Sequence, residues 1–245
     1  MRFRYGTTVS TVDVSGGRAT GVITDDGERI AADVVVLNPD LPVAYRDLLR
    51  ETPRRLRYSP SAVVLHIGST QRYGRIAHHN IHFGRSWRGT FDEVIRKGRR
   101  MSDPSLLVTN PTRADPALAP AGREVYYVLA PVPNEAVSTM DWRGRLPREY
   151  AGELVATLEA RGYYDFGAGI EVSHVVTPAD WTDAGLAAGT PFAAAHTLRQ
   201  TGPFRPGNLH PALSNVVFTG SGTRPGVGVP MVLISGKLAA QRITG

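Results

Sequence analysis

Short alternating runs of apolar and polar positions open this chain of 245 residues. The alternation from Phe3 to Val14 is typical of a β-strand, and the run ADVVVLN at 32–38 predicts a buried strand that ends at an Asn-Pro break. The pattern then predicts a helix from Pro39 to Arg50, with Asp40 as its N-terminal cap. We therefore expect the first segment to combine strands with one helix.

The pattern changes after Pro53 to longer strands and loops that are rich in proline and arginine. Helical spacing at 148–162 is followed by a further predicted strand at 170–178. The apolar runs that predict strands of a second sheet lie at 61–69, 76–84, 104–110 and 123–132.

Near the end of the chain, the apolar strand 216–218 leads into a glycine-rich turn and then into a helix. Pro230 falls in the first helical turn, where its missing N–H costs nothing. The first amides of this helix point back at the turn, so a partial positive charge faces whatever binds there. The glycines that remove Cβ atoms from the path of a ligand are Gly220, Gly222, Gly226 and Gly228. The apolar positions that we expect to pack inward are Leu233, Ile234, Leu238 and Ala239.

This order of strand, glycine turn and helix lets a backbone approach a dinucleotide cofactor closely. No GxGxxG followed by an acidic residue occurs in the sequence, so the turn is not the fingerprint that opens a Rossmann domain. A tight turn between a strand and a core helix explains the spacing equally well. On the pattern alone, both interpretations stay open.

Composition is that of a globular protein, because 42% of the residues are hydrophobic and 20% are charged. A net charge of +6 favours an anionic partner, either phospholipid or nucleic acid. The absence of cysteine excludes disulfides, thiolate nucleophiles and cysteine metal ligands. No apolar run approaches the roughly 20 residues that span a bilayer, and the start at Met1 does not have the pattern of a signal peptide. We expect a soluble or peripheral protein.

The amino-acid sequence of the glycine-rich segment resembles a motif of a known family. GSGTRPGVGVPMVLISGKLAA at 220–240 resembles the C-terminal flavin-binding motif of the phytoene-desaturase family of carotenoid biosynthesis, flavoproteins related to the amine oxidases. The family's opening GxGxxG stretch is missing, so the chain looks like the C-terminal half of such a protein. Further segments that resemble the family, in the family's order, are 28–49, 73–84, 101–134 and 200–208.

The resemblance implies an α/β (α+β) fold with remnants of a Rossmann-like FAD-binding domain at both chain ends, 1–50 and 201–245. A substrate domain of mixed sheet and helices, 51–200, is inserted between them and is expected to bind carotenoid and membrane. The implied cofactor is FAD, with the adenine ring at the backbone of Val9. The other implied cofactor-binding residues are Gly220, Ser221, Gly222, Gly228, Val229, Pro230 and Met231.

The implied activity is that of an FAD-dependent oxidoreductase of bacterial carotenoid biosynthesis. It introduces double bonds into phytoene or a related polyisoprenoid by hydride transfer to flavin, with quinone or oxygen as the electron acceptor, and no catalytic side chain is assigned. Expected partners are the polyisoprenoid, the membrane and a missing N-terminal half, without nucleic acid. Two alternatives remain: a related flavoenzyme (carotenoid isomerase, ketolase, saturase or amine-oxidase-like enzyme), and a catalytically silent, membrane-associated fragment.

The segment 87–100 predicts an amphipathic helix with one apolar stripe. The stripe suits either a lipid interface or packing on the core. The resemblance implies the first, at the cytoplasmic face of the cell membrane, because a carotenoid precursor is dissolved in lipid. The stripe consists of Trp87, Phe91, Val94 and Ile95, and its basic flanks are Arg88, Arg96, Lys97, Arg99 and Arg100.

Three other polar clusters could suggest a metal site, a catalytic base or surface ion pairs. A strand places His78 and His82 on one face and His79 on the other, and two histidines without a carboxylate make a poor metal site, so no metal is expected. Asp180 and Asp183 suit either a base with its orienting group or a simple turn. Asp92 and Glu93 are expected to pair with Arg96 and Lys97 along a helix surface.

Overall fold

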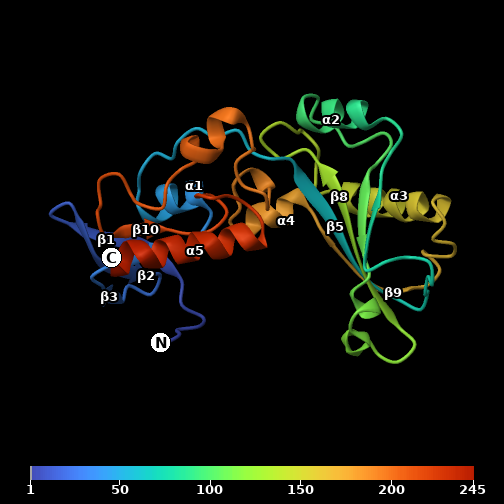
Figure 1. The fold of residues 1–245 in the computed structure, drawn as a ribbon, viewed down its shortest axis with the longest axis horizontal. Coiled ribbons are helices and arrows are strands. Elements are labelled where there is room, and N and C mark those ends of the chain that lie inside the picture. Colours follow the sequence, from blue (N-terminus) through green and yellow to red (C-terminus); the bar gives the residue numbers. More distant parts are fainter. Residues whose placement is uncertain (1) are drawn as a thin grey trace. The chain divides into compact units, whose positions relative to one another are not determined.

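The computed structural model describes residues 2–245 as a mixed α/β fold of two compact units (Figure 1). The first unit holds residues 2–59, 185–187 and 192–245, and the second holds 60–184 and 188–191. Segments 51–59, 185–187 and 192–200, which we assigned to the inserted domain, thus lie in the first unit. Met1, the first residue of the segment assigned to 1–50, lies outside the described residues.

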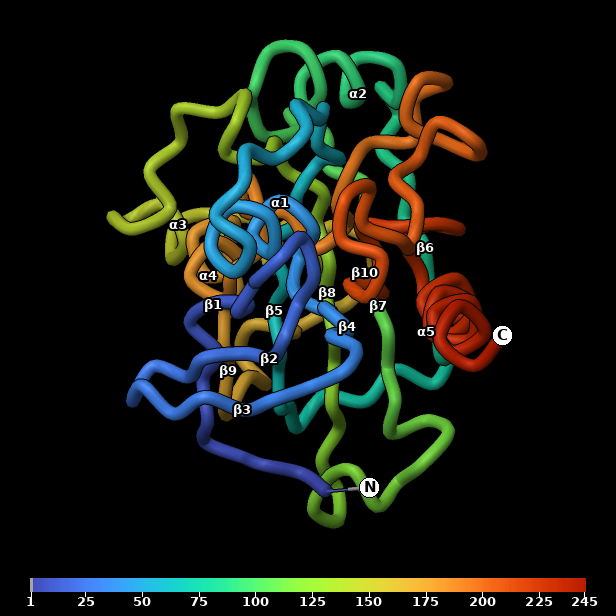
Figure 2. Tube along the Cα trace, turned by 90° about the vertical axis from the view of Figure 1, so that its left-hand side faces the viewer, coloured from blue at the N-terminus to red at the C-terminus, as the bar shows by residue number. Residues whose placement is uncertain are grey.

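A three-stranded antiparallel sheet begins the first unit. Strands β1 (Val9–Ser15), β2 (Arg18–Thr24) and β3 (Arg29–Ala31) follow one another in sheet order and run side by side in Figure 2. The side chain of Asn215 ties this sheet to the start of β10 (Val216–Phe218), because its amide group donates to the carbonyls of Ala19 and Asp33. The strand predicted from the pattern at Phe3 to Val14 is confirmed only from Val9 onward, as β1.

Two strands that are far apart in the sequence form a parallel pair in the same unit. Strand β4 (Val35–Leu37) pairs with β10, so that Val35 lies opposite Val216 and Leu37 lies opposite Phe218. Their apolar side chains share one core. The helix predicted from Pro39 begins as α1 (Leu41–Val43) and continues as a π-helical turn, η1 (Ala44–Leu48). Asp40 caps it, as predicted, by accepting from the amide of Leu41.

Helix α5 (Val229–Thr244) ends the chain, and the face that we predicted to pack inward is largely exposed. Leu233 is 70% exposed and Ile234 is also exposed, whereas the small side chains of Ser235 and Ala239 are buried. The prediction was wrong for Leu233 and Ile234, because helical spacing places apolar residues on one face without showing what covers that face. It is confirmed for Ala239, and Leu238 is half-buried. The exposed side chains of α5 leave apolar surface unpartnered, whereas in the β4–β10 pair Val36 alone is exposed.

The second unit is built on a five-stranded antiparallel sheet, with the order β6-β7-β8-β5-β9. Strand β5 pairs with β8 along its whole length, from Ser61 opposite Val132 to Ser69 opposite Glu124. All five strands coincide with predicted ones. Their bounds are β5 (Ser61–Ser69), β6 (His79–His82), β7 (Leu106–Thr109), β8 (Glu124–Val132) and β9 (Ile170–Val176).

The two faces of this sheet differ in burial. Side chains in β8 alternate between buried and half-buried, and the buried ones pack with the apolar side of α3 (Leu146–Ala160). The opposite face carries half-buried apolar side chains, among them Leu107, Tyr127 and Leu129. One face is therefore the core of the unit, and the other offers apolar surface.

Short helices complete the chain. Helix α4 (Pro178–Asp183) begins with a capping box between Thr177 and Asp180.

No helix among the described residues is long and apolar enough to cross a membrane. The remaining short helices are α2 (Trp87–Ile95), η2 (Pro111–Arg113), η3 (Pro116–Leu118), η4 (Ala187–Gly189), η5 (Leu198–Gln200) and η6 (Gly202–Phe204).

Candidate functional site

The glycine-rich turn between β10 and α5 contains glycines with two different functions. A Cβ at Gly220 would lie 2.7 Å from Oδ1 of Asn38, and one at Gly222 would lie 2.7 Å from Cβ of Leu41. These two glycines let the chain pack against itself. Gly228 has φ +111° and nothing within 4 Å of the added Cβ. Of these three glycines, Gly228 is the one that opens onto free space for a ligand.

Gly228 is also the N-cap of α5, and it cannot cap the helix with a side chain. The amide of Val232 donates to the carbonyl of Gly228 at 2.9 Å, which leaves the earlier amides of Val229 and Met231 without intrahelical partners. Pro230 is the second helical residue, and the first turn contains no acidic residue. The turn therefore leads into an uncapped, electropositive helix end.

A buried polar network fastens the turn to α5. The hydroxyl of Ser235 is fully buried, accepts from the amide of Gly220 at 3.1 Å and lies 2.8 Å from the hydroxyl of Thr223. The side-chain amide of Asn208 donates to Ser235 at 3.2 Å and to the carbonyl of Phe218 at 2.9 Å. The sequence analysis missed these residues, although a serine within the apolar run VLIS is a signal that could have found Ser235.

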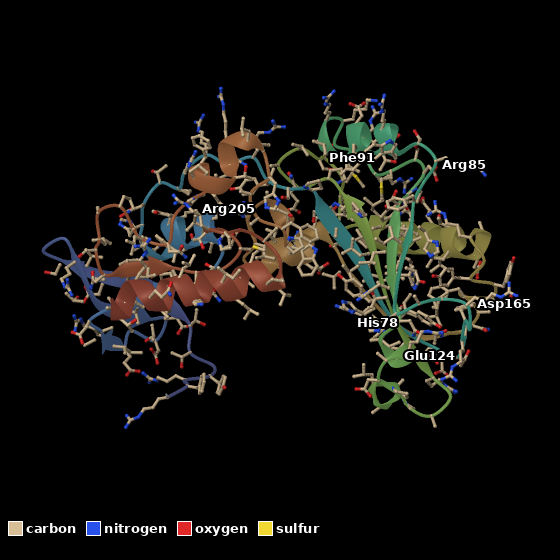
Figure 3. All side chains as sticks on the ribbon, in the orientation of Figure 1. His78, Arg85, Phe91, Glu124, Asp165 and Arg205 are labelled. Atoms are coloured by element: carbon tan, nitrogen blue, oxygen red, sulfur yellow. The ribbon has the colours of Figure 1, made fainter. Side chains whose placement is uncertain are left out.

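Arg205 lies beneath the same turn and is 1% exposed (Figure 3). Its guanidinium donates to the carbonyls of Thr223 at 3.0 Å and Ser221 at 2.5 Å. Burial lowers the pKa of this guanidinium. Within residues 2–245 no carboxylate forms an ion pair with it. Sequence reasoning also missed Arg205, because nothing in the run GPFRPGN shows that its arginine is buried.

The structure brings together all but one of the residues predicted to bind the cofactor. Those in the segment 220–231 lie on the turn and the first helical residues of α5. Val9 lies elsewhere, at the start of β1 in the other sheet of this unit, where it pairs with Thr24. A contact between Val9 and an adenine ring stays a prediction.

Helix α2 leaves most of its apolar stripe exposed. Trp87 is 59% exposed and Phe91 is 53% exposed, with their rings edge to face, whereas Val94 is buried. The helix ends at Ile95, earlier than the predicted 87–100, because the chain turns at Gly98 with φ +61°. An apolar cavity of about 180 Å³ adjoins it, lined by Pro60, Phe83, Trp87, Thr90, Phe91, Val94, Met101, Ser105 and Pro131.

The basic residues around α2 differ in how far they are neutralised. Asp92 pairs with Lys97 at 2.6 Å and with Arg96 at 3.8 Å, which confirms its predicted pairing, whereas Glu93 accepts from the amide of Ser102 instead. Arg100 pairs with Glu153 at 2.8 Å. Arg88 and Arg99 form no ion pair with any residue from 2 to 245.

Two of the three histidines in the segment 78–82 have hydroxyl partners, whereas Nδ1 of His78 is buried without one among residues 2–245. The ring of His82 lies 2.9 Å from the Tyr163 hydroxyl, and the ring of His79 lies 2.9 Å from the Thr109 hydroxyl. In the described part of the chain, no three His, Cys, Asp or Glu side chains gather as they would around a metal.

The acidic pair of the ADWTDAG segment lies in helix α4. Asp180 caps α4, and Asp183 pairs with Arg143 at 2.6 Å, which lowers the pKa of Asp183. Thr177 and Asp180 form a capping box, which starts the helix, and the turn follows at Ala184 and Gly185. Each carboxylate has its own partner, so neither is free to orient the other.

Comparison with solved structures supports the fold. An oxidoreductase from Methanosarcina mazei superposes with a TM-score of 0.58 at 18% sequence identity, over 96% of this chain and 49% of that one. The predicted α/β (α+β) class is confirmed.

Curated relatives are closer in sequence. A phytoene dehydrogenase from Streptomyces griseus is 57% identical, over 99% of this chain and 48% of the relative. A zeta-carotene-forming phytoene desaturase from Myxococcus xanthus is 39% identical, again over 99% and 48%. The chain thus spans about half the length of these relatives. The family described as flavin containing amine oxidoreductase matches residues 1–244. The chain belongs to this flavin-containing amine oxidoreductase family.

Proposed function

We propose that this chain forms part of an FAD-dependent oxidoreductase that introduces double bonds into phytoene or a related polyisoprenoid. The observation that carries the proposal is the turn at Gly228, which opens onto free space at the uncapped end of α5. The 57% identity to the phytoene dehydrogenase of Streptomyces griseus supports the choice of substrate class. The flavin, when bound, supplies the hydride acceptor.

The residues of the turn fit the isoalloxazine end of a flavin. Gly228 admits a flat ring because no Cβ stands in its way. The amides of Val229 and Met231 orient toward an electron-rich ring edge and stabilise negative charge that arrives there. The other residues assigned to this site are Gly220, Ser221, Gly222 and Pro230.

The second unit is the proposed substrate domain. The sheet face that carries Leu107, Tyr127 and Leu129 offers half-buried apolar side chains, which suit a polyisoprenoid chain. The first unit, which holds both chain ends, is the proposed cofactor domain. The electron acceptor in this proposal is a quinone or oxygen.

Helix α2 is the proposed membrane contact, at the cytoplasmic face of the cell membrane. Exposure of Trp87 and Phe91 beside an apolar cavity favours a lipid interface over packing on the core. Arg88 and Arg99 add positive charge that no neighbouring acid neutralises. Such a surface collects a lipid-dissolved substrate from an anionic membrane.

A segment like the part of the relatives that this chain does not match is a further proposed partner. The exposed apolar side of α5, with Leu233 and Ile234, needs a cover, and so does Val36 of β4, which is 48% exposed. The chain covers only 48% of its Streptomyces griseus relative. The part of such a protein that this chain does not match would bind here and supply the remaining contacts to FAD.

A hybrid protein tests this function. We define the hybrid as this chain joined to the part of the Streptomyces griseus phytoene dehydrogenase that it does not match. The hybrid should purify with bound flavin and convert phytoene to products with more double bonds, whereas the chain alone should purify colourless. A hybrid that folds without flavin, or stoichiometric flavin on the chain alone, would contradict the proposal.

A further inference from the structure

Arg205 is a buried cation that the fold leaves without a counter-charge. Its donors meet only backbone carbonyls: those of Thr223 and Ser221, and at 3.5 Å that of Gln200. An arginine keeps its charge in proteins, even where burial lowers its pKa. A buried charge without a partner of opposite charge is costly. The fold therefore holds an uncompensated positive charge beneath the glycine-rich turn.

The guanidinium also fixes the direction of the peptide bond between Ser221 and Gly222. The C=O and N–H of a trans peptide point in opposite directions, so binding the Ser221 carbonyl turns the N–H of Gly222 away from Arg205. Gly222 is buried, and within residues 2–245 its N–H meets no acceptor. Buried amides without an acceptor are rare. Arg205 thus sets the orientation of this peptide bond within the turn.

Two sources of positive potential therefore act on one short segment. A Cβ at Gly226 would lie 3.7 Å from Nε of Arg205, so the turn passes directly over the guanidinium. Two residues later the turn ends at Gly228 and the uncapped start of α5. No acidic residue in the first turn of α5 opposes this charge. The segment favours the state of a ligand that carries more negative charge.

We propose that Arg205 is a positioning residue for the flavin, which holds the turn through the carbonyls of Thr223 and Ser221 and favours the negatively charged state of the ring. The inference rests on the proposed function, because it needs the isoalloxazine end at this turn. Arg205 is too deeply buried to touch the ring, and it acts through the turn and through its charge.

Two measurements on the flavin-loaded hybrid report this effect without turnover. Sulfite adds to oxidised flavin and leaves one negative charge on the ring, so its dissociation constant measures the local positive potential. Reduction by two electrons and one proton also adds one negative charge, and the reduction potential measures the same effect independently. The matched control is Arg54, an exposed arginine that likewise binds a backbone carbonyl, that of Phe204 at 3.1 Å.

Arg205→Met should weaken sulfite binding at least tenfold and shift the redox equilibrium tenfold against reduction, about 30 mV for a two-electron couple. Arg205→Lys keeps the charge and should stay within threefold of the parent in both measurements, as should Arg54→Met. A flavin-loaded Arg205→Met hybrid with unchanged sulfite affinity and potential, but a lower melting temperature, would overturn the inference and leave the proposed function standing.

The lysine variant decides the question if the methionine variant does not fold. A folded Arg205→Lys hybrid with parental sulfite affinity supports the role of the charge, and a tenfold loss in that variant overturns it. A parent hybrid that binds no flavin would overturn the proposed function and this inference together.

Discussion

Ser235 accepts a hydrogen bond from the amide of Gly220, 3.1 Å away, and thereby fastens the start of the glycine-rich turn to α5. The serine hydroxyl is fully buried and also contacts Thr223 and Asn208. Replacement by alanine leaves the amide of Gly220 without its acceptor, which costs about 1–3 kcal/mol. Urea unfolding of Ser235→Ala should show a loss of this size, whereas Ser173→Ala, on an exposed strand position, should match the parent. Equal stability of both variants would contradict the structural function of Ser235.

Gly228→Val should abolish flavin binding by the hybrid, because the side chain enters the open space at the helix end. The backbone strain at a positive φ is a separate effect. Gly27 controls for it, since it has φ +88° and nothing within 4 Å. Gly27→Val should lower the melting temperature and leave the flavin absorbance unchanged. Normal flavin content in Gly228→Val would show that the ring lies elsewhere.

Charge reversal of Arg88 and Arg99 to glutamate should release the protein from anionic vesicles. Each basic residue near such a surface contributes about 1 kcal/mol, so the double reversal should weaken vesicle co-sedimentation by tenfold or more. Unchanged sedimentation of the reversed protein would refute the interfacial position of α2.

Phe91→Ser should also reduce vesicle binding, but with little effect on the melting temperature, because the ring is 53% exposed. The matched control is Val94→Ser on the buried side of the same helix, which should lower the melting temperature markedly. If Phe91→Ser unfolds the protein as Val94→Ser does, α2 packs its aromatic stripe on the core.

Glu124 should make the stability of the second unit depend on pH. Burial acts to raise the pKa of this carboxyl, but hydrogen bonds from Thr112 and Asn110 and the ion pair with Arg72 outweigh it, so the pKa is lowered. A lowered folded pKa adds stability above the unfolded value of 4.5, and this stability is lost as the pH falls through the folded pKa. Unfolding free energies at pH 7 and below pH 4 should differ less in Glu124→Gln than in the parent, and an equal difference would contradict this assignment.

The sequence predicted the strands well, because alternation along β8 depends only on which face of the sheet is buried. It failed for burial and for hydrogen bonds that depend on residues far away in the sequence. The spacing of Leu233 and Ile234 gave the apolar side of α5 correctly but not its exposure. The importance of Arg205 and Ser235 depends on carbonyls and amides from other segments, which no local pattern reveals. The residues of the turn were predictable because they form one continuous motif.

Flavin content and phytoene conversion by the hybrid, measured in one preparation, test the proposed function most directly. We predict stoichiometric flavin absorbance and products with extended conjugation, and the loss of both in Gly228→Val but not in Gly27→Val. A folded hybrid that binds no flavin, or that binds it and leaves phytoene unchanged, would contradict the proposed function.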